Sequence, residues 1–325
     1  MNILLVRVSS LGDVLHNLPV VADILRHHPD AQIDWVVEEG YVGLVRLNPS
    51  VRRVIPFALR RWRKGLANPA VRAEVAGFFR TLRSERYDYV FDTQGLIKTG
   101  LIMACARLAP GGRKVGLANG TEDSGYEGVS RIFHTQSIPV ARRTHAVARG
   151  REVVAGALGY AVDTPPDFGL APLPPTRPAW LPDGDYATFF HATARAAKQW
   201  APAHWIALGQ ALAPLPVLLP WGSAAEQEAA QRLADALPNA RVLPRLSMAD
   251  AVELARRARL AVGVDTGLTH IAAAAGTPTV EIYADSPRWK TEGNWSSRIV
   301  NLGDTGAPPA VPEVLAAARR LLETT

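Results

Sequence analysis

Two runs of alternating strand-like and helix-like segments make up most of this sequence, and a proline-dense stretch separates them. Proline lacks an amide donor and fixes φ, so such a stretch forms neither regular helix nor central strand. A chain of 325 residues is long enough for two domains of ordinary size. We therefore predict a domain over residues 1–165, a linker over 166–184 and a second domain over 185–311. A last helix over 312–325 is expected to pack back on the first domain. The prolines of the stretch are Pro165, Pro166, Pro172, Pro174, Pro175, Pro178 and Pro182.

Each run alternates short apolar segments with segments whose apolar residues recur at helical spacing. This rhythm indicates a parallel sheet with helices on both faces. The predicted fold class is therefore α/β, with two Rossmann-like, doubly wound domains facing each other across a cleft. Ligands of such sheets bind at the carboxyl ends of the strands. The predicted strands are residues 2–8, 32–37, 53–57, 87–91, 186–190, 217–219, 241–243, 260–264 and 279–283. The predicted helices are residues 12–27, 71–83, 96–108, 204–212, 224–237, 248–257, 268–275 and 312–322.

Composition and motifs exclude several classes of protein. The single cysteine, Cys105, cannot form an internal disulfide, which suits a reducing cytoplasm, and its apolar neighbours predict a buried helix position. The apolar start is short and is interrupted by Arg7, so no signal peptide is predicted, and no stretch approaches the ~18 apolar residues of a membrane span. No C-x-x-C or H-E-x-x-H motif indicates a metal, and neither the dinucleotide glycine pattern nor a P-loop is present. We expect a cytoplasmic protein without a metal or nicotinamide cofactor.

The positive charge is concentrated in the first half of the chain. Residues 1–172 contain 22 Lys and Arg against 16 Asp and Glu, which accounts for the whole net charge of +6. Within residues 52–83 there are nine cations and a single acid, Glu74. Such a patch attracts a polyanion, namely nucleic acid, an acidic membrane or a phosphorylated substrate, although a solvated helix face has the same composition.

The first candidate site is Ser9-Ser10-Leu11-Gly12-Asp13, where the first strand ends and a helix begins. Backbone amides and small side chains at a helix N-terminus suit anionic groups. Asp13 is a candidate catalytic base, but an ordinary first-turn acid would look the same. The helix dipole lowers the pKa of such a carboxylate, and desolvation around a substrate offsets that effect.

Three further candidate sites follow strands of the second half. Thr193 and Lys198 lie in the loop 191–198, where a hydroxyl, amides and a cation suit a diphosphate. The segment Asp265-Thr266-Gly267-Leu268-Thr269-His270 opens a helix whose first amides suit a phosphate, although Asp and Thr are also favoured caps. The loop of Trp221 and Gly222 suits a nucleoside, with Glu226 accepting from ribose hydroxyls.

Taken together, these segments resemble the bacterial heptosyltransferases of lipopolysaccharide core synthesis. The resemblance runs in order over nearly the whole chain, and the Trp-Val-Val-Glu-Glu and Arg-Arg-Trp-Arg-Lys segments are similar to heptosyltransferase I rather than II. The resembling segments are residues 9–16, 35–39, 60–64, 92–98, 191–193, 219–222 and 264–270.

The resemblance implies a GT-B fold and an inverting transfer of L-glycero-D-manno-heptose from ADP-heptose to the inner Kdo of Kdo2-lipid A. Asp13 is implied as the base and Lys198 as the cation that stabilises the leaving diphosphate, with no essential metal. The lipid acceptor implies peripheral contact with the cytoplasmic face of the inner membrane. Implied donor-site residues are Thr193, Ala194, Lys198, Trp221, Gly222, Glu226, Asp265, Thr266, Gly267 and His270. Implied acceptor-site residues are Ser10, Gly12, Arg60, Arg61, Arg63, Lys64, Gln94, Lys98 and Arg149, with Trp62 among the cations of this patch.

The chain departs from the family pattern in three places. Ala194 stands where relatives often have a second threonine, residues 284–287 read Ala-Asp-Ser-Pro in place of Thr-Asp-Pro, and residues 118–128 are acidic where an acceptor-binding arginine is expected. These departures bear on the exact acceptor more than on the donor class. Two other enzymes of the same fold are alternatives, heptosyltransferase II and a sugar-nucleotide epimerase. A nucleic-acid binder is a further alternative from the pI of about 9.7, but the cationic patch lacks interleaved stacking aromatics.

Overall fold

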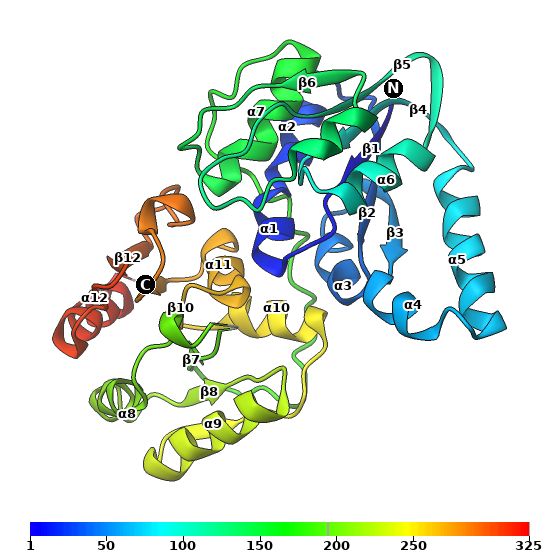
Figure 1. Ribbon diagram of the computed structural model, residues 1–325. Coiled ribbons are helices and arrows are strands. Elements are labelled where there is room, and N and C mark those ends of the chain that lie inside the picture. Colours follow the sequence, from blue (N-terminus) through cyan, green and yellow to red (C-terminus); the bar gives the residue numbers. More distant parts are fainter. Residues whose placement is uncertain (194, 325) are drawn as a thin grey trace. The chain divides into compact units, whose positions relative to one another are not determined.

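The computed structural model describes residues 1–193 and 195–324, which form two compact units. Unit 1 comprises Met1–Ala171 and unit 2 comprises Pro172–Thr325. The boundary between the units falls inside the proline-dense stretch. Each unit contains one sheet of six parallel strands with helices on both faces (Figure 1). The predicted fold class, α/β with two doubly wound domains, is confirmed.

The sheet of unit 1 has the order β3-β2-β1-β4-β5-β6, so the first strand lies in the middle. That first strand is a continuous apolar run from Ile3 to Val6 and is buried on both faces, as the centre of a parallel sheet requires. The sheet is formed by β1 (Asn2–Val6), β2 (Gln32–Glu38), β3 (Val51–Phe57), β4 (Arg86–Asp92), β5 (Arg107–Leu117) and β6 (Gln136–Ile138).

Two helical layers cover this sheet. On one face, Trp62, Phe78 and Met103 pack with strand residues into a single core. That layer contains α4 (Leu59–Gly65), α5 (Pro69–Leu82), α6 (Ile97–Cys105) and the 3-10 helix η2 (Gly128–Phe133), which packs on α6. The other layer contains α1 (Leu11–His16), α2 (Pro19–His27) and α7 (Ala146–Leu158), which pack on one another. The short elements η1 (Glu39–Tyr41) and α3 (Val42–Val45) follow β2.

Unit 2 repeats the same topology, with the order β12-β11-β10-β7-β8-β9. Its strands are β7 (Ala187–Phe190), β8 (Val217–Leu219), β9 (Ala240–Val242), β10 (Leu260–Val264), β11 (Thr279–Tyr283) and β12 (Ile299–Gly303). Its helices are η3 (Ala196–Lys198), α8 (Pro202–Ala211), α9 (Ala224–Ala236), α10 (Met248–Arg257), α11 (Gly267–Ala274), η4 (Arg288–Lys290) and α12 (Val311–Glu323).

Several predicted boundaries were wrong. The helix predicted over 12–27 is two helices, because the chain turns at Asn17 and Leu18 before Pro19 starts α2. The helix predicted over 96–108 ends at Cys105, which is only partly buried, and Leu108 already belongs to β5. The helices and strands that were not predicted are α3, α4, β5, β6, α7 and β12, together with the 3-10 helices η1 to η4.

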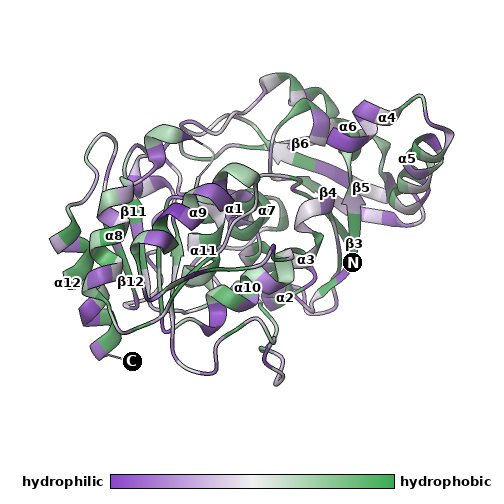
Figure 2. Cartoon of the chain, turned by 90° about the horizontal axis from the view of Figure 1, so that it is seen from below, coloured by the Kyte–Doolittle hydropathy of each residue, from purple (hydrophilic) through white to green (hydrophobic). Residues whose placement is uncertain are grey.

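The C-terminal helix was expected on the first domain, but α12 packs into the core of unit 2 against α8 and β11. Its buried stripe is formed by Val314, Ala317, Ala318 and Leu321. Hydrophobic and hydrophilic residues alternate around this helix (Figure 2), as expected for a helix with one face on a core.

Candidate functional site

The two sheets share one strand order, and each has a point where the direction of winding reverses. This point lies between β1 and β4 in unit 1 and between β7 and β10 in unit 2. In doubly wound folds the loops at the carboxyl ends of these strands form the ligand site. The candidate residues Ser10, Asp13, Gln94 and Lys98 follow β1 and β4, whereas Thr193, Lys198, Asp265 and His270 follow β7 and β10.

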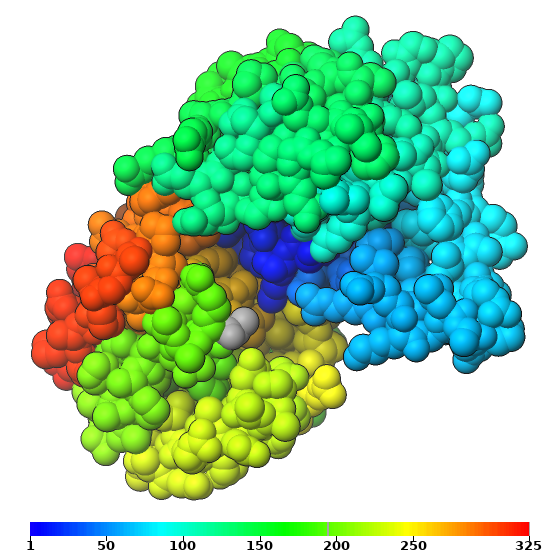
Figure 3. All heavy atoms as spheres, in the orientation of Figure 1, coloured from blue at the N-terminus to red at the C-terminus, as the bar shows by residue number. Residues whose placement is uncertain are grey.

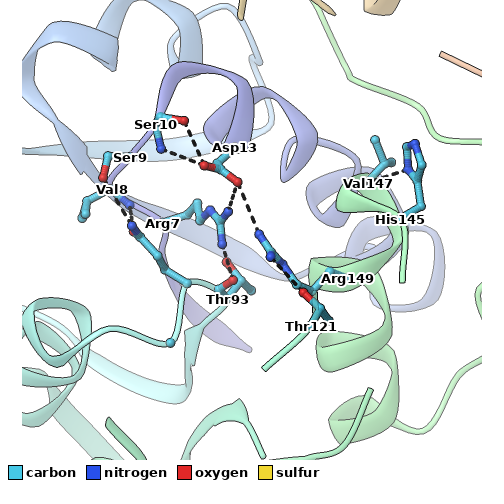
Figure 4. Close-up of polar contacts among 12 residues, drawn as sticks. Arg7, Val8, Ser9, Ser10, Asp13, Thr93, Thr121, His145, Val147 and Arg149 are labelled. Atoms are coloured by element: carbon cyan, nitrogen blue, oxygen red, sulfur yellow. Dashed lines mark hydrogen bonds and ion pairs between the residues drawn. The ribbon is translucent and has the colours of Figure 1, made fainter. Parts of the chain in front are cut away.

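In unit 1, two arginines and a serine converge on the carboxylate of Asp13 (Figure 4). Oδ1 accepts from Nη2 of Arg7 at 2.5 Å and from Nη2 of Arg149 at 3.3 Å. Oδ2 accepts from the backbone N and the Oγ of Ser10 at 3.0 and 2.9 Å. Both arginines are buried, and they are fixed in turn by Thr93 and Thr121. Arg149, implied as an acceptor-site residue, is therefore a direct partner of Asp13.

The charges around Asp13 keep it ionised. Burial on its own would raise the pKa of this carboxyl, but the cations of Arg7 and Arg149 outweigh burial and hold its pKa well below the usual range. The side chain of Asp13 nevertheless remains 36% exposed, so a ligand can reach it. Asp13 is thus a fixed anion with an accessible edge. Gly12 precedes it in the first turn of α1.

The loop after β4 brings Gln94 and Lys98 to the end of β1. Oε1 of Gln94 accepts from the backbone N of Val8 at 3.0 Å, and Nζ of Lys98 donates to Oγ of Ser9 at 3.0 Å. Asp92 organises this loop, because Oδ1 accepts from the backbone N of Gln94 and of Gly95, both at 2.9 Å. Burial lowers the pKa of Lys98. Ser9, Gln94 and Lys98 therefore form one polar cluster beside Asp13.

The cationic segment 60–64 forms helix α4. Arg60, Arg61 and Lys64 line a pocket of about 430 Å³ whose other lining residues are Glu38, Glu39, Gly40 and Tyr41. Arg61 is already paired with both Glu39 and Glu74, at 2.9 and 2.5 Å. Within the described residues, no ion pair involves Arg60, Arg63 or Lys64.

Trp62 does not belong to this cationic surface. It was expected beside the cations, but its indole is buried and packs against Phe57 and Phe78, with ring centroids 5.3 and 5.4 Å away. The helix turns its one large apolar residue toward the core, as an amphipathic helix does.

In unit 2, four ionisable side chains form a continuous chain of contacts. Nζ of Lys198 donates to Oδ2 of Asp265, whose Oδ1 lies 3.0 Å from Nε2 of His270. Nδ1 of His270 lies 2.9 Å from Oε1 of Glu281. The other oxygen of Glu281 accepts from the hydroxyl of Tyr283 at 3.0 Å and from the backbone N of Gly293 at 2.8 Å. His270 and Glu281 are buried, whereas Lys198 is partly exposed at the outer end.

This chain of contacts shifts the pKa of its two middle members, His270 and Asp265. Burial lowers the pKa of His270, but Glu281 and Asp265 outweigh it and raise its pKa to about 10. The ring is therefore an imidazolium at neutral pH and donates from both nitrogens. Burial would raise the pKa of Asp265, but the hydrogen bond and charge of His270, with Lys198, hold it well below the usual range.

Three further candidate residues, Thr193, Thr266 and Gly267, lie in the two loops that contain Lys198 and Asp265. Oγ1 of Thr193 lies 3.5 Å from the carbonyl oxygen of Asp265, its acceptor, so the loops after β7 and β10 meet. Thr266 is the N-cap of α11 and makes no side-chain cap bond, and Gly267 is the first residue of that helix. Their amides stand at a helix N-terminus, where anions bind. Ala194, a candidate of the same loop, lies outside the described residues.

The loop after β8 is tied by local bonds. Nε1 of Trp221 donates to the carbonyl of Leu243 at 2.7 Å, and Oε2 of Glu226 accepts from the backbone N of Gly222 at 2.7 Å. Glu226 also caps α9 together with Ser223. These local bonds therefore occupy one carboxylate oxygen of Glu226, Oε2.

Three residues that complete these clusters were missed by the sequence reasoning, namely Arg7, Thr93 and Glu281. Arg7 and Glu281 had a detectable signal, because each is a lone charge in or next to an otherwise apolar, fully buried strand. A charge in such a place is costly unless it is paired, so it predicts a partner. Thr93 accepts from Arg7 only through its backbone carbonyl. Because any residue type has such a carbonyl, this contact could not be predicted from the identity of the side chain.

Neither a metal cluster nor a membrane-spanning helix occurs in the described part of the chain. Across residues 1–193 and 195–324, no three His, Cys, Asp or Glu side chains are grouped as metal ligands. None of the helices described above is both long and apolar enough to cross a bilayer.

Comparison with known proteins places these clusters in context. The model of glycosyltransferase family 9 (heptosyltransferase) matches residues 75–314. The chain is 41% identical over 290 residues to lipopolysaccharide heptosyltransferase 1 of Pseudomonas aeruginosa, covering 87% of this chain and 78% of that protein. The solved Escherichia coli heptosyltransferase WaaC with ADP is 32% identical, with a TM-score of 0.86 over 99% of this chain and 100% of that chain. The same enzyme with ADP-2-deoxy-2-fluoro heptose is 33% identical, with a TM-score of 0.79 over 100% and 99%.

Proposed function

Because the chain belongs to glycosyltransferase family 9, the heptosyltransferases, we propose that it transfers heptose in lipopolysaccharide core synthesis. The donor is ADP-heptose, the acceptor is the inner Kdo of Kdo2-lipid A, and the two units form a GT-B enzyme. The observation that carries this proposal is the pair of charged clusters at the two switch points: an ionised carboxylate in unit 1, and the Lys198–Asp265–His270–Glu281 chain in unit 2.

The donor binds unit 2 in this proposal. The amides of Thr266 and Gly267 and the ammonium of Lys198 receive the diphosphate, since a helix N-terminus and a cation both stabilise phosphate charge. Lys198 then shares its charge between Asp265 and the diphosphate. The imidazolium of His270 neutralises the negative charge of Asp265, so that this carboxylate does not repel the diphosphate of the donor. Thr193, Ala194, Trp221, Gly222 and Glu226 complete the site around sugar, base and ribose.

Asp13 is the catalytic base. The acceptor hydroxyl of Kdo attacks the anomeric carbon of heptose while its proton passes to Asp13. The bond from that carbon to the diphosphate oxygen breaks, ADP departs, and the anomeric configuration inverts. A carboxylate held by two arginines is a weak base at rest, but an acceptor that covers its exposed edge desolvates it and raises its pKa. No step in this scheme requires a metal.

The acceptor binds unit 1. Arg60, Arg63 and Lys64 are available for the carboxylates and phosphates of Kdo2-lipid A, whereas Arg61 binds through a guanidinium that Glu39 and Glu74 already hold. Ser10, Gly12, Gln94, Lys98 and Arg149 lie nearer Asp13 and position the hydroxyl. Because the acceptor is a lipid, the protein works peripherally on the cytoplasmic face of the inner membrane.

The direct test is incubation of the purified protein with ADP-heptose and Kdo2-lipid A, with the lipid followed by mass. A gain of one heptose, dependent on both substrates, supports the proposal. ADP release without any lipid acceptor would indicate another reaction of the nucleotide sugar, and no reaction of either substrate would refute the proposal.

A further inference from the structure

Most of the large apolar side chains that are exposed in the described part of the chain lie in one layer. Of the seven large apolar side chains that are exposed among the described residues, five lie on α5, α6 or η2, one directly follows α4, and the seventh is Met1. The most exposed is Ile132, at 72%. Exposed apolar residues gathered on one layer are unusual on a soluble surface and point to an interaction site. The six are Leu66, Phe79, Ile97, Leu101, Val129 and Ile132.

These four elements cover the same face of the sheet of unit 1, since Trp62, Phe78, Ile102 and Met103 share one core there. η2 packs on α6, which brings Leu101 and Ile132 into one neighbourhood, and Arg83 at the end of α5 donates to the last carbonyl of α6 at 3.1 Å. The opposite layer, α1, α2 and α7, carries none of the exposed large apolar residues. The apolar surface is therefore a property of one face.

The same layer carries the positive charge. Residues 59–83 contain seven cations and one acid, and they form a continuous part of the surface in Figure 3 (blue to cyan). Glu74, the single acid, is already neutralised by Arg61. Arg131 adds a cation to η2, between Val129 and Ile132. Helices α1, α2 and α7 carry three cations (Arg26, Arg149, Arg151) and three acids (Asp13, Asp23, Glu152), so their charges balance.

We infer that the outer surface of α4, α5, α6 and η2 docks onto an anionic lipid bilayer. Aliphatic side chains flanked by arginine and lysine are the composition that inserts into the boundary between headgroups and acyl chains. A second copy of the chain fits poorly, because face-to-face pairing would bring two cationic segments together. Nucleic acid fits poorly as well, because only one of the six exposed side chains is aromatic. The inference rests on the proposed function for its purpose, which is to bring the enzyme to a lipid acceptor.

Flotation with lipid vesicles tests this inference without any sugar substrate. The vesicles contain phosphatidylcholine with roughly 30% phosphatidylglycerol, to imitate an anionic leaflet. They should bind the wild-type protein, whereas vesicles of pure phosphatidylcholine should bind it far less. The double variant Leu101→Glu/Ile132→Glu should lower the vesicle partition coefficient about ten-fold or more, by losing apolar insertion and adding repulsion. The matched control Ala225→Glu, on the exposed start of α9 in unit 2, should bind as the wild type does.

The double variant should keep its melting temperature and its activity on a water-soluble, lipid-free Kdo saccharide, which separates lost docking from lost folding. Equal vesicle binding by wild type and double variant would overturn the inference, as would failure of the wild type to bind anionic vesicles. A change in sedimentation coefficient in the double variant would assign the surface to a second copy instead. Vesicle binding without heptose transfer to the saccharide would refute the proposed function and leave this inference standing.

Discussion

Nδ1 of His270 lies 2.9 Å from Oε1 of Glu281, and both side chains are fully enclosed in unit 2. Oδ1 of Asp265 lies 3.0 Å from the other ring nitrogen, so the imidazolium is held between two carboxylates. The contact joins strand β11 to helix α11 next to Asp265, the residue that binds Lys198. Glu281 therefore fixes the orientation of the proposed diphosphate site without reaching its surface.

The first prediction concerns stability and pH. Folding raises the pKa of His270 from 6.5 to about 10, so the folded state holds this proton more tightly than the unfolded chain. Its stabilisation is complete below about pH 6.5 and is lost as the pH rises through about 10. Glu281→Gln should lower the free energy of unfolding by about 3–5 kcal/mol near neutral pH, because it breaks a buried ion pair. Urea unfolding at several pH values measures both effects.

Comparing the pH dependence of stability of the wild type and Glu281→Gln isolates the contribution of the His270–Glu281 pair, because the other titrating groups contribute equally to both proteins. The wild type should lose more stability between pH 6.5 and 10 than Glu281→Gln does, and Glu281→Asp should recover part of the difference. Parallel curves for wild type and Glu281→Gln would show that Glu281 does not set the charge of His270.

The strands that carry the candidate residues, β1 and β10, could be located from the sequence because each is a short buried apolar run, although the helix after β1 is two helices and not one. The side chains that bind these candidate residues could not be predicted from the sequence. Arg149 and Asp13 are 136 residues apart, and only the packing of α7 on α1 brings them together. Nor could helix α7 itself be recognised, since Gly150 and Gly156 weaken its propensity. A Cβ at Gly150 would come too close to Oδ1 of Asn17, so a larger residue there would force the Asn17 side chain to move.

Strand β5 escaped prediction for a different reason. It contains Pro110, Gly111 and Gly112, and its pairing with β4 shifts register between Tyr87 and Tyr89. Proline and glycine argue against a regular strand, and a bulge breaks the two-residue alternation on which strand prediction depends. The sequence therefore shows a loop where the structure has an irregular strand.

The second prediction tests Asp13 as the base. Asp13→Asn keeps the shape of the side chain but cannot accept the proton of the acceptor hydroxyl. The turnover number kcat should fall by about 10²–10⁴-fold, the usual contribution of a general base. ADP affinity should be unchanged, since the donor is proposed to bind unit 2. Steady-state kinetics and calorimetric titration with ADP measure the two quantities.

Asp23→Asn is the matched control, because Asp23 is also a carboxylate held by an arginine in unit 1, with Nε of Arg151 2.6 Å away. It should lower the melting temperature and leave kcat near the wild-type value. Comparable activity of Asp13→Asn and wild type would remove Asp13 from the chemistry and return it to a first-turn acid.

The third prediction concerns Lys198. Lys198→Met removes the cation that balances the departing diphosphate and leaves Asp265 with His270 as its remaining cationic partner. Both ADP affinity and kcat should fall, with kcat lower by about 10²–10³-fold, as for loss of one electrostatic contact to a transition state. Arg195 is an exposed cation of the same loop and serves as the control. Arg195→Ala should change ADP affinity and kcat by no more than a few-fold, which would show that the effect depends on the position of Lys198. A loss of ADP affinity with unchanged kcat would limit Lys198 to ground-state binding.

The fourth prediction separates the members of the cationic segment. The triple variant Arg60→Ala/Arg63→Ala/Lys64→Ala should raise the acceptor KM about ten-fold or more, because charge-assisted bonds contribute about 1.5–3 kcal/mol each. The donor KM should stay constant. Arg61→Ala should have the smaller effect, since Glu39 and Glu74 already hold that guanidinium. Because these side chains are exposed, the difference from wild type should shrink as salt rises. Arg319→Ala, an exposed cation of α12, serves as the control. An unchanged acceptor KM in the triple variant would mean that this helix face is merely solvated.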